Sequence, residues 1–79
     1  MSAKAFVLIE TVVGKTNEVC IALQKLEAIK TVDAVTGHYD IIITIEGDDL
    51  NAIGKLVAGK IHATPGILRT VTCLSLQVN

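Results

Sequence analysis

The chain has 79 residues, of which 51% are hydrophobic, and its formal charge is −1, from seven Lys or Arg and eight Asp or Glu residues. A chain this short buries only roughly 60% of its unfolded surface, so residues 1–79 are expected to form one domain with one core. The nearly neutral charge, the absence of like-charged runs, and the presence of only two aromatic residues, Phe6 and Tyr39, argue against direct nucleic-acid binding.

The sequence also argues against export and against a membrane span. Its apolar runs fall far short of the roughly 20 residues that a transmembrane helix needs. Residues 1–10 hold one lysine, a short apolar run and then an acid, which is not the pattern of a signal peptide. Cys20 and Cys73 stand in apolar contexts without CxxC spacing, which is typical of buried thiols in a reducing compartment. We therefore expect a cytoplasmic protein.

The first third of the chain predicts a strand followed by a helix. Residues 4–13 are mostly β-branched or large and apolar, which suits a strand that is buried on both faces. Gly14 interrupts this run, and Thr16 is suited to cap a helix that ends near residues 28–30. The apolar stripe of that helix consists of Val19, Leu23, Leu26 and Ile29.

Two β-branched stretches, residues 31–36 and 41–46, predict a hairpin with residues 37–40 as its connection. In the second stretch the isoleucines at odd-numbered positions point to one face, and Ile42 points to the other. Both faces of this strand therefore need apolar cover.

The last third predicts a second helix and a final strand. Gly47 interrupts the preceding strand, and Asp48 and Asp49 supply an N-cap and favourable charge in the first helical turn. Thr64-Pro65-Gly66 ends the helix, and residues 67–78 alternate apolar and polar side chains as a strand does. The apolar stripe of this helix consists of Leu50, Ile53, Val57 and Ile61.

The element order βαββαβ with short connections predicts an α+β, ferredoxin-like sandwich that has both helices on one face of a four-stranded sheet. The helices can cover only one face, yet the strand over 41–46 is apolar on both. We therefore expect a second copy to pack its sheet or edge strands on the first and to form a dimeric α+β barrel.

Neither a phosphate-binding loop nor a metal site is supported by the spacing. The run 14–16, Gly-Lys-Thr, resembles the end of a P-loop, but that motif needs a glycine where Ile9 stands, so a turn and a helix cap are favoured. His38 and His62 have no Cys or acidic residues at zinc-like intervals. We expect no metal and no cofactor.

The hairpin connection is the strongest candidate for a ligand loop. Gly37 permits dihedral angles that expose backbone amides, and Asp40 can accept a hydrogen bond from an ammonium group, as an amino acid would offer. An equally weighted alternative is that Gly37 only turns the hairpin and Asp40 caps it. Thr70 and Thr72 share one face of the last strand and could line the same pocket across an interface.

The segment 35–41, Val-Thr-Gly-His-Tyr-Asp-Ile, followed by Pro-Gly-Ile at 65–67 and Thr-Val-Thr at 70–72, resembles the effector domain of the Lrp/AsnC family, also called the RAM domain. The resemblance spans nearly the whole chain, and its specificity lies in the order of the motifs. It implies a ferredoxin-like fold, dimers whose sheets join face to face, and rings of dimers with amino acids bound where dimers meet.

The resemblance also assigns ligand-binding residues. The ligand loop of the family falls on Gly37, His38, Tyr39 and Asp40, and its threonine-bearing strand, which comes from a neighbouring subunit, falls on Thr70 and Thr72. Family members often carry an acidic or amide residue where His38 stands, and commonly a leucine where Thr64 stands.

Full-length relatives carry an amino-terminal helix-turn-helix domain, whereas the first strand here is predicted to begin within a few residues of Met1. The resemblance therefore implies a stand-alone RAM protein that senses an amino acid, or that modulates full-length family regulators by mixed assembly. Two alternatives stay open. One is a small dimeric α+β barrel enzyme that uses residues 38–40, His-Tyr-Asp, for proton transfer, and the other is an assembly module without a ligand. The leading hypothesis requires no catalytic residues.

Overall fold

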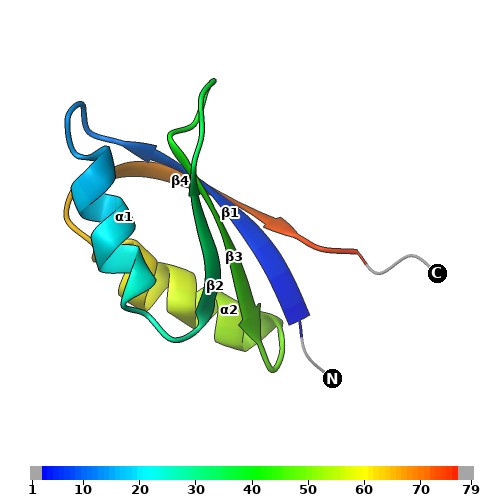
Figure 1. Ribbon diagram of the computed structural model, residues 1–79. Coiled ribbons are helices and arrows are strands. Elements are labelled where there is room, and N and C mark those ends of the chain that lie inside the picture. Colours follow the sequence, from blue (N-terminus) through cyan, green and yellow to red (C-terminus); the bar gives the residue numbers. More distant parts are fainter. Residues whose placement is uncertain (1–2, 77–79) are drawn as a thin grey trace.

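The computed structural model describes residues 3–76 and has the predicted element order (Figure 1). The elements are β1 (Ala3–Thr11), α1 (Thr16–Gln24), β2 (Ile29–Ala34), β3 (Ile41–Gly47), α2 (Leu50–Leu56), the π-helical turn η1 (Val57–Ile61) and β4 (Ile67–Leu74). The last strand thus ends before the predicted limit, and residues 77 and 78 of that prediction lie outside the described residues. No helix within residues 3–76 is long and apolar enough to cross a membrane.

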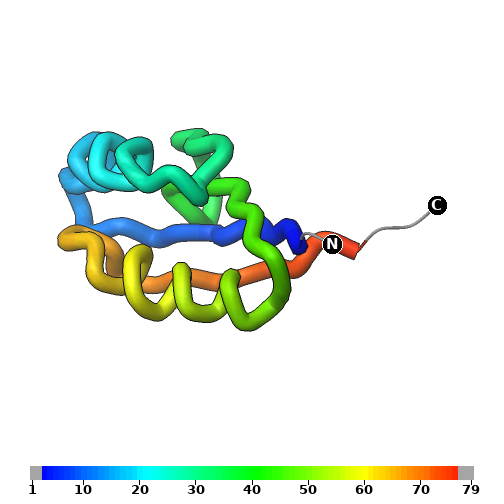
Figure 2. Tube along the Cα trace, turned by 90° about the horizontal axis from the view of Figure 1, so that it is seen from below, coloured from blue at the N-terminus to red at the C-terminus, as the bar shows by residue number. Residues whose placement is uncertain are grey.

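The four strands form one antiparallel sheet in the order β2-β3-β1-β4. Both helices follow the length of the sheet. In the projection of Figure 2, α1 (cyan) appears on one side of β1 (blue) and α2 (yellow-green) on the other, although both helices cover the same face of the sheet. One core joins the helices to a single face of the sheet, which confirms the ferredoxin-like α+β sandwich. Its fully or almost fully buried members are Ala5, Val7, Ile9, Val19, Leu23, Ile29, Ile41, Ile43, Ile45, Ile53, Val57 and Ile61.

The opposite, helix-free face of the sheet carries a second set of apolar side chains. Alternation along β3 places Ile42 there, partly exposed, while the three isoleucines at odd positions are fully buried, as predicted. Strand pairing brings together the other members of this set, because Phe6 lies opposite Cys73, and Leu8 lies opposite both Ile42 and Val71. Phe6 and Val71 are each 37% exposed in the single chain. Packing of a second copy here remains a prediction.

The cysteines differ from the expectation that both are buried. Cys20 on α1 is half-buried against the core, but Cys73 is exposed on the edge strand β4. The prediction that Cys73 is buried was wrong because apolar neighbours in the sequence do not guarantee burial in a strand. Successive side chains of β4 point to opposite faces of the sheet, and β4 has no partner strand on its outer side.

The first helix is shorter than predicted and begins differently. It ends at Gln24, where the backbone turns more tightly than in an α-helix. Leu26 N donates to Leu23 O and Ile29 N donates to Leu26 O, each over three residues and at 3.1 Å, and β2 then begins at Ile29. Thr16 is not the cap, since Lys15 occupies the N-cap position without a side-chain bond.

The second helix begins as predicted and ends in an unpredicted way. Asp49 is the N-cap, and its Oδ1 accepts a hydrogen bond of 2.9 Å from Ala52 N. Leu50 is 60% exposed and so does not belong to the buried stripe. The π-helical turn widens the helix end, as shown by the 2.9 Å bond from His62 N to Val57 O.

Candidate ligand-binding site

The predicted ligand loop is the connection of the β2–β3 hairpin, which projects past the end of the sheet (green, Figure 1). Val35 N donates to Asp40 O at 2.9 Å and closes the loop, and Gly37 adopts a φ of 117° within it. Asp40 N donates to Ile9 O, also at 2.9 Å, so the loop is attached to β1 as well. Gly37 therefore does turn the hairpin, as one of the two interpretations expects.

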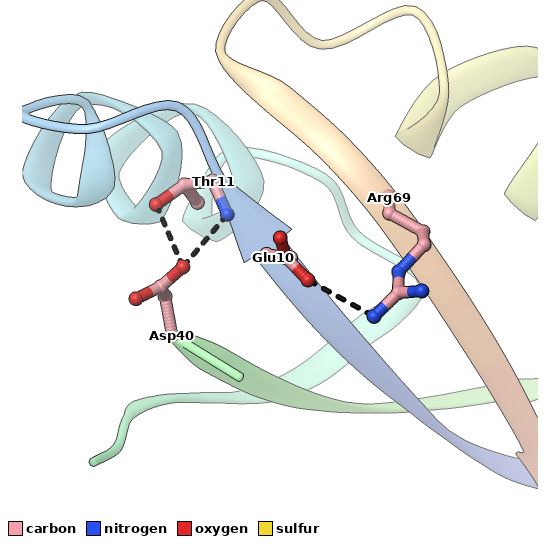
Figure 3. Close-up of polar contacts among 4 residues, drawn as sticks. All are labelled: Glu10, Thr11, Asp40 and Arg69. Atoms are coloured by element: carbon pink, nitrogen blue, oxygen red, sulfur yellow. Dashed lines mark hydrogen bonds and ion pairs between the residues drawn. The ribbon is translucent and has the colours of Figure 1, made fainter. Parts of the chain in front are cut away.

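The side chain of Asp40 does not cap the hairpin but reaches the end of β1 (Figure 3). Its Oδ2 accepts a hydrogen bond of 2.8 Å from Thr11 N and one of 3.2 Å from the Thr11 hydroxyl. The Thr11 hydroxyl, in turn, lies 2.9 Å from the hydroxyl of Thr16, at the start of α1. Thr11 is only 7% exposed, so these bonds satisfy a buried polar residue and tie three segments together.

A second polar pair joins β1 to β4 beside these bonds (Figure 3). Glu10 and Arg69 are register partners, and Arg69 Nη2 donates to Glu10 Oε2 at 3.1 Å. The Arg69 side chain is 64% exposed and that of Glu10 is 31% exposed. Solvent screens such a pair, so its contribution to stability is small. The pair matters because it fixes the position of the Glu10 carboxylate at this end of the sheet.

An open cavity of about 650 Å³ lies at this end of the sheet. It brings together the end of β1, the turn before α1, the hairpin and the start of β4. Its lining residues are Glu10, Thr11, Val12, Val13, Gly14, Thr16, His38, Asp40 and Leu68. Among the predicted ligand residues, His38 and Asp40 line it, whereas Gly37 and Tyr39 do not.

The predicted threonine pair lies elsewhere on the same chain. Thr70 Oγ1 is 2.8 Å from His62 Nε2 and lines a hollow of about 430 Å³ that Arg69 also lines. Thr72 lines a groove of about 470 Å³ between β4 and α2. Neither threonine lines the cavity beside Asp40, so a joint site with the hairpin requires a second subunit and stays a prediction.

Sequence reasoning did not identify Glu10, Thr11 or Leu68 as site residues. The signals that could have found them are a carboxylate and a hydroxyl that end an otherwise apolar strand. Within residues 3–76, no group of three or more His, Cys, Asp or Glu side chains could hold a metal ion.

Known sequences show which family this chain resembles. The model of the Lrp/AsnC ligand binding domain matches residues 4–78. The homocitrate synthase of Saccharolobus solfataricus is 31% identical over 62 residues, which is 78% of this chain. The chain spans only 13% of the length of that enzyme, so the similarity concerns one segment of it.

Solved structures show the same fold. FFRP-DM1 has a TM-score of 0.89 and 32% identity, with 94% of this chain and 99% of that chain covered. The hypothetical protein PHS023 from Pyrococcus horikoshii has a TM-score of 0.88 and 32% identity, with 99% and 93% covered. A transcriptional regulator from Neisseria meningitidis in complex with L-methionine has a TM-score of 0.86 and 18% identity, with 95% and 50% covered. By its sequence match over residues 4–78 and by its fold, the chain belongs to the Lrp/AsnC ligand-binding domain family.

Proposed function

We propose that the protein is an amino-acid-responsive regulatory module. The observation that carries this proposal is the cavity of about 650 Å³ in which the hairpin carboxylate of Asp40 lies beside the end of β1. The family to which the chain belongs is one of ligand-binding domains, and the similar Neisseria regulator binds L-methionine. An amino acid offers the ammonium group that suits a carboxylate at the mouth of an open cavity.

In this proposal Asp40 binds the ligand with the carboxylate oxygen that accepts no hydrogen bond from residues 3–76. Its Oδ2 accepts both bonds from Thr11, which leaves Oδ1 for the ammonium group. The remaining residues of the proposed site are Gly37, His38 and Tyr39 from the same loop, with Thr70 and Thr72 from a neighbouring subunit.

We also propose that the protein works as a homodimer and as a ring of dimers. The support is the helix-free face, where Phe6, Leu8, Ile42 and Val71 form an apolar surface that the helices leave uncovered. A ligand that bridges subunits then shifts the balance between assembly states through its different affinity for each.

The proposed cellular role is to modulate transcriptional regulation of amino acid metabolism in the cytoplasm, by mixed assembly with full-length family regulators and without direct DNA contact. The formal charge of −1 supports the absence of DNA contact. A second candidate role is the regulation of an enzyme, because the segment that this chain resembles in homocitrate synthase forms part of an enzyme. Co-purification from the native host distinguishes these roles: recovery of a full-length regulator supports the first, and recovery of a biosynthetic enzyme supports the second.

The ligand proposal is tested by thermal unfolding in the presence of each of the twenty amino acids. A ligand raises the unfolding temperature according to its concentration relative to its Kd, so at least one amino acid is expected to stabilise the protein. Calorimetry then compares Asp40→Ala with Glu27→Ala, which removes an exposed carboxylate from the turn between α1 and β2. Asp40→Ala is expected to weaken binding by about 1–3 kcal/mol, while Glu27→Ala leaves binding unchanged. No stabilisation across the panel would reject the proposal.

A further inference from the structure

We infer that the cavity beside Asp40 selects amino acids with a positively charged side chain, and that Glu10 is the residue that recognises this charge. The inference rests on the proposed function and adds the class of ligand. Its basis is the hydrogen-bonding character and the charge of the groups that line the cavity.

The first step is an account of the hydroxyl protons. Thr11 has one hydroxyl proton and donates it to Asp40 Oδ2. The contact of 2.9 Å between the two threonine hydroxyls therefore requires Thr16 to be the donor and Thr11 the acceptor. With that proton used, the Thr16 hydroxyl offers only lone pairs to any further partner. Asp40 thus fixes the direction of a short chain of hydrogen bonds, and the hydroxyls of the cavity can only accept.

The second step concerns charge. Among the described residues, the carboxylates of Glu10 and Asp40 and the imidazole of His38 line the cavity, and neither Lys nor Arg lines it. Arg69 binds Glu10 from β4 with its own side chain 64% exposed, so solvent weakens the compensation that it provides. Lys15 lies next to the cavity in sequence but is directed to Glu18, at 3.6 Å. The side chains of the cavity therefore present an excess of negative charge.

The third step compares this excess with what an amino acid brings. The α-ammonium group is matched by Asp40, and the α-carboxylate is common to all amino acids, so it does not distinguish one side chain from another. The second carboxylate of the cavity, that of Glu10, then has no counterpart in a ligand with a neutral side chain. Its Oε2 holds Arg69, while Oε1 is left to accept from a second cation without loss of the Arg69 bond. An acidic ligand side chain would instead meet a like charge in a partly desolvated site.

The test uses three amino acids with five carbons each and different side-chain charge: ornithine, norvaline and glutamate. Calorimetry on the full chain is expected to give a Kd for ornithine about tenfold lower than that for norvaline, and the weakest binding for glutamate. Glu10→Gln should raise the Kd for ornithine to the level of norvaline and leave norvaline unchanged. The matched control is Glu27→Gln, which removes an exposed carboxylate outside the cavity and should preserve the preference.

Equal affinity for the three amino acids, or an ornithine preference that survives Glu10→Gln, would overturn the inference while leaving the proposed function intact. If no amino acid binds, the proposed function fails, and the charge selectivity is still decided by pentane-1,5-diamine against glutarate. Amide NMR signals of Thr11 and Thr16 should then shift with the diamine only, and a shift with glutarate, or with neither compound, would overturn the inference.

Discussion

Asp40 and Thr11 are 29 positions apart in the sequence, yet one oxygen of the Asp40 carboxylate accepts hydrogen bonds from both the backbone amide and the hydroxyl of Thr11. The bond to the amide satisfies a donor where β1 ends, at a residue that is almost completely buried. The position of the proposed ligand loop is thus fixed by the same strand that carries Glu10 into the cavity.

Asp40→Ala is expected to lower the free energy of unfolding by about 1–3 kcal/mol, because it leaves the buried amide and hydroxyl of Thr11 without their acceptor. Asp40→Asn should cost less, since an amide oxygen in the place of Oδ2 still accepts both bonds, though more weakly than a carboxylate oxygen. Urea denaturation measures both values, and Glu27→Ala, an exposed substitution outside the sheet, should change stability by no more than about 0.5 kcal/mol. If Asp40→Ala and Asp40→Asn lower the free energy of unfolding equally, then the hydrogen bonds that the Asp40 side chain accepts do not account for the loss.

Gly66 is expected to be irreplaceable for a steric and a conformational reason. Its φ is 95°, and a Cβ placed there would lie 2.9 Å from Val19 Cγ2 and 3.2 Å from Lys15 Cβ. Gly66→Ala should therefore destabilise the protein by more than about 1 kcal/mol in urea denaturation. Gly54→Ala provides the contrast, because its Cβ enters open space on α2 and should stabilise the helix by about 0.5–1 kcal/mol. Similar effects for the two substitutions would contradict this account.

The two faces of β3 should respond differently to the same truncation. Ile43 is fully buried between the sheet and the helices, so Ile43→Ala is expected to cost about 2–5 kcal/mol. Ile42, its neighbour on the helix-free face, is only partly buried in the single chain, and Ile42→Ala should cost less at low protein concentration. If a second copy covers this face, the cost of Ile42→Ala in urea denaturation rises with protein concentration. If Ile42→Ala and Ile43→Ala lower the free energy of unfolding equally at every protein concentration, the two faces of β3 do not differ as proposed.

Local patterns were sufficient to predict most elements of the fold. Alternation identified β3 and its two faces, the N-cap residue Asp49 marked the second helix, and Gly37 marked the hairpin turn. Each of these signals depends on neighbours within a few positions, where backbone geometry and burial leave a repeating pattern.

The features that escaped prediction depend on contacts between distant segments. Thr16 has the chemistry of a helix cap, but its hydroxyl bonds to Thr11, which pairs with Ile67 of β4. The predicted apolar stripe of the first helix includes Ile29, yet Ile29 instead pairs opposite Ile45 in the sheet and is buried there. Glu10 enters the cavity because β1 ends beside the hairpin, which no local pattern encodes.

Burial raises the pKa of the Cys20 thiol above its ordinary value, because desolvation disfavours the thiolate. A pKa that is higher in the folded than in the unfolded state adds stability below the unfolded value, and this stability is lost as the pH rises through the folded value. Cys20→Ser should therefore reduce the alkaline loss of stability, as followed by urea denaturation across that pH range. An unchanged alkaline profile would show that Cys20 does not contribute to it.

The exposure of Cys73 makes alkylation a direct test of whether a second copy covers the helix-free face. In dilute protein, iodoacetamide should modify Cys73 faster than Cys20, because Cys73 is exposed and the thiolate of Cys20 is disfavoured by burial. Cys73 lies opposite Phe6 on the helix-free face, so packing of a second copy there should slow its modification as protein concentration rises. Cys20→Ser and Cys73→Ser variants assign the two rates by mass spectrometry. A Cys73 rate that stays fast at every concentration would mean that this face remains open to solvent, and the proposed dimer would then have to form through another surface.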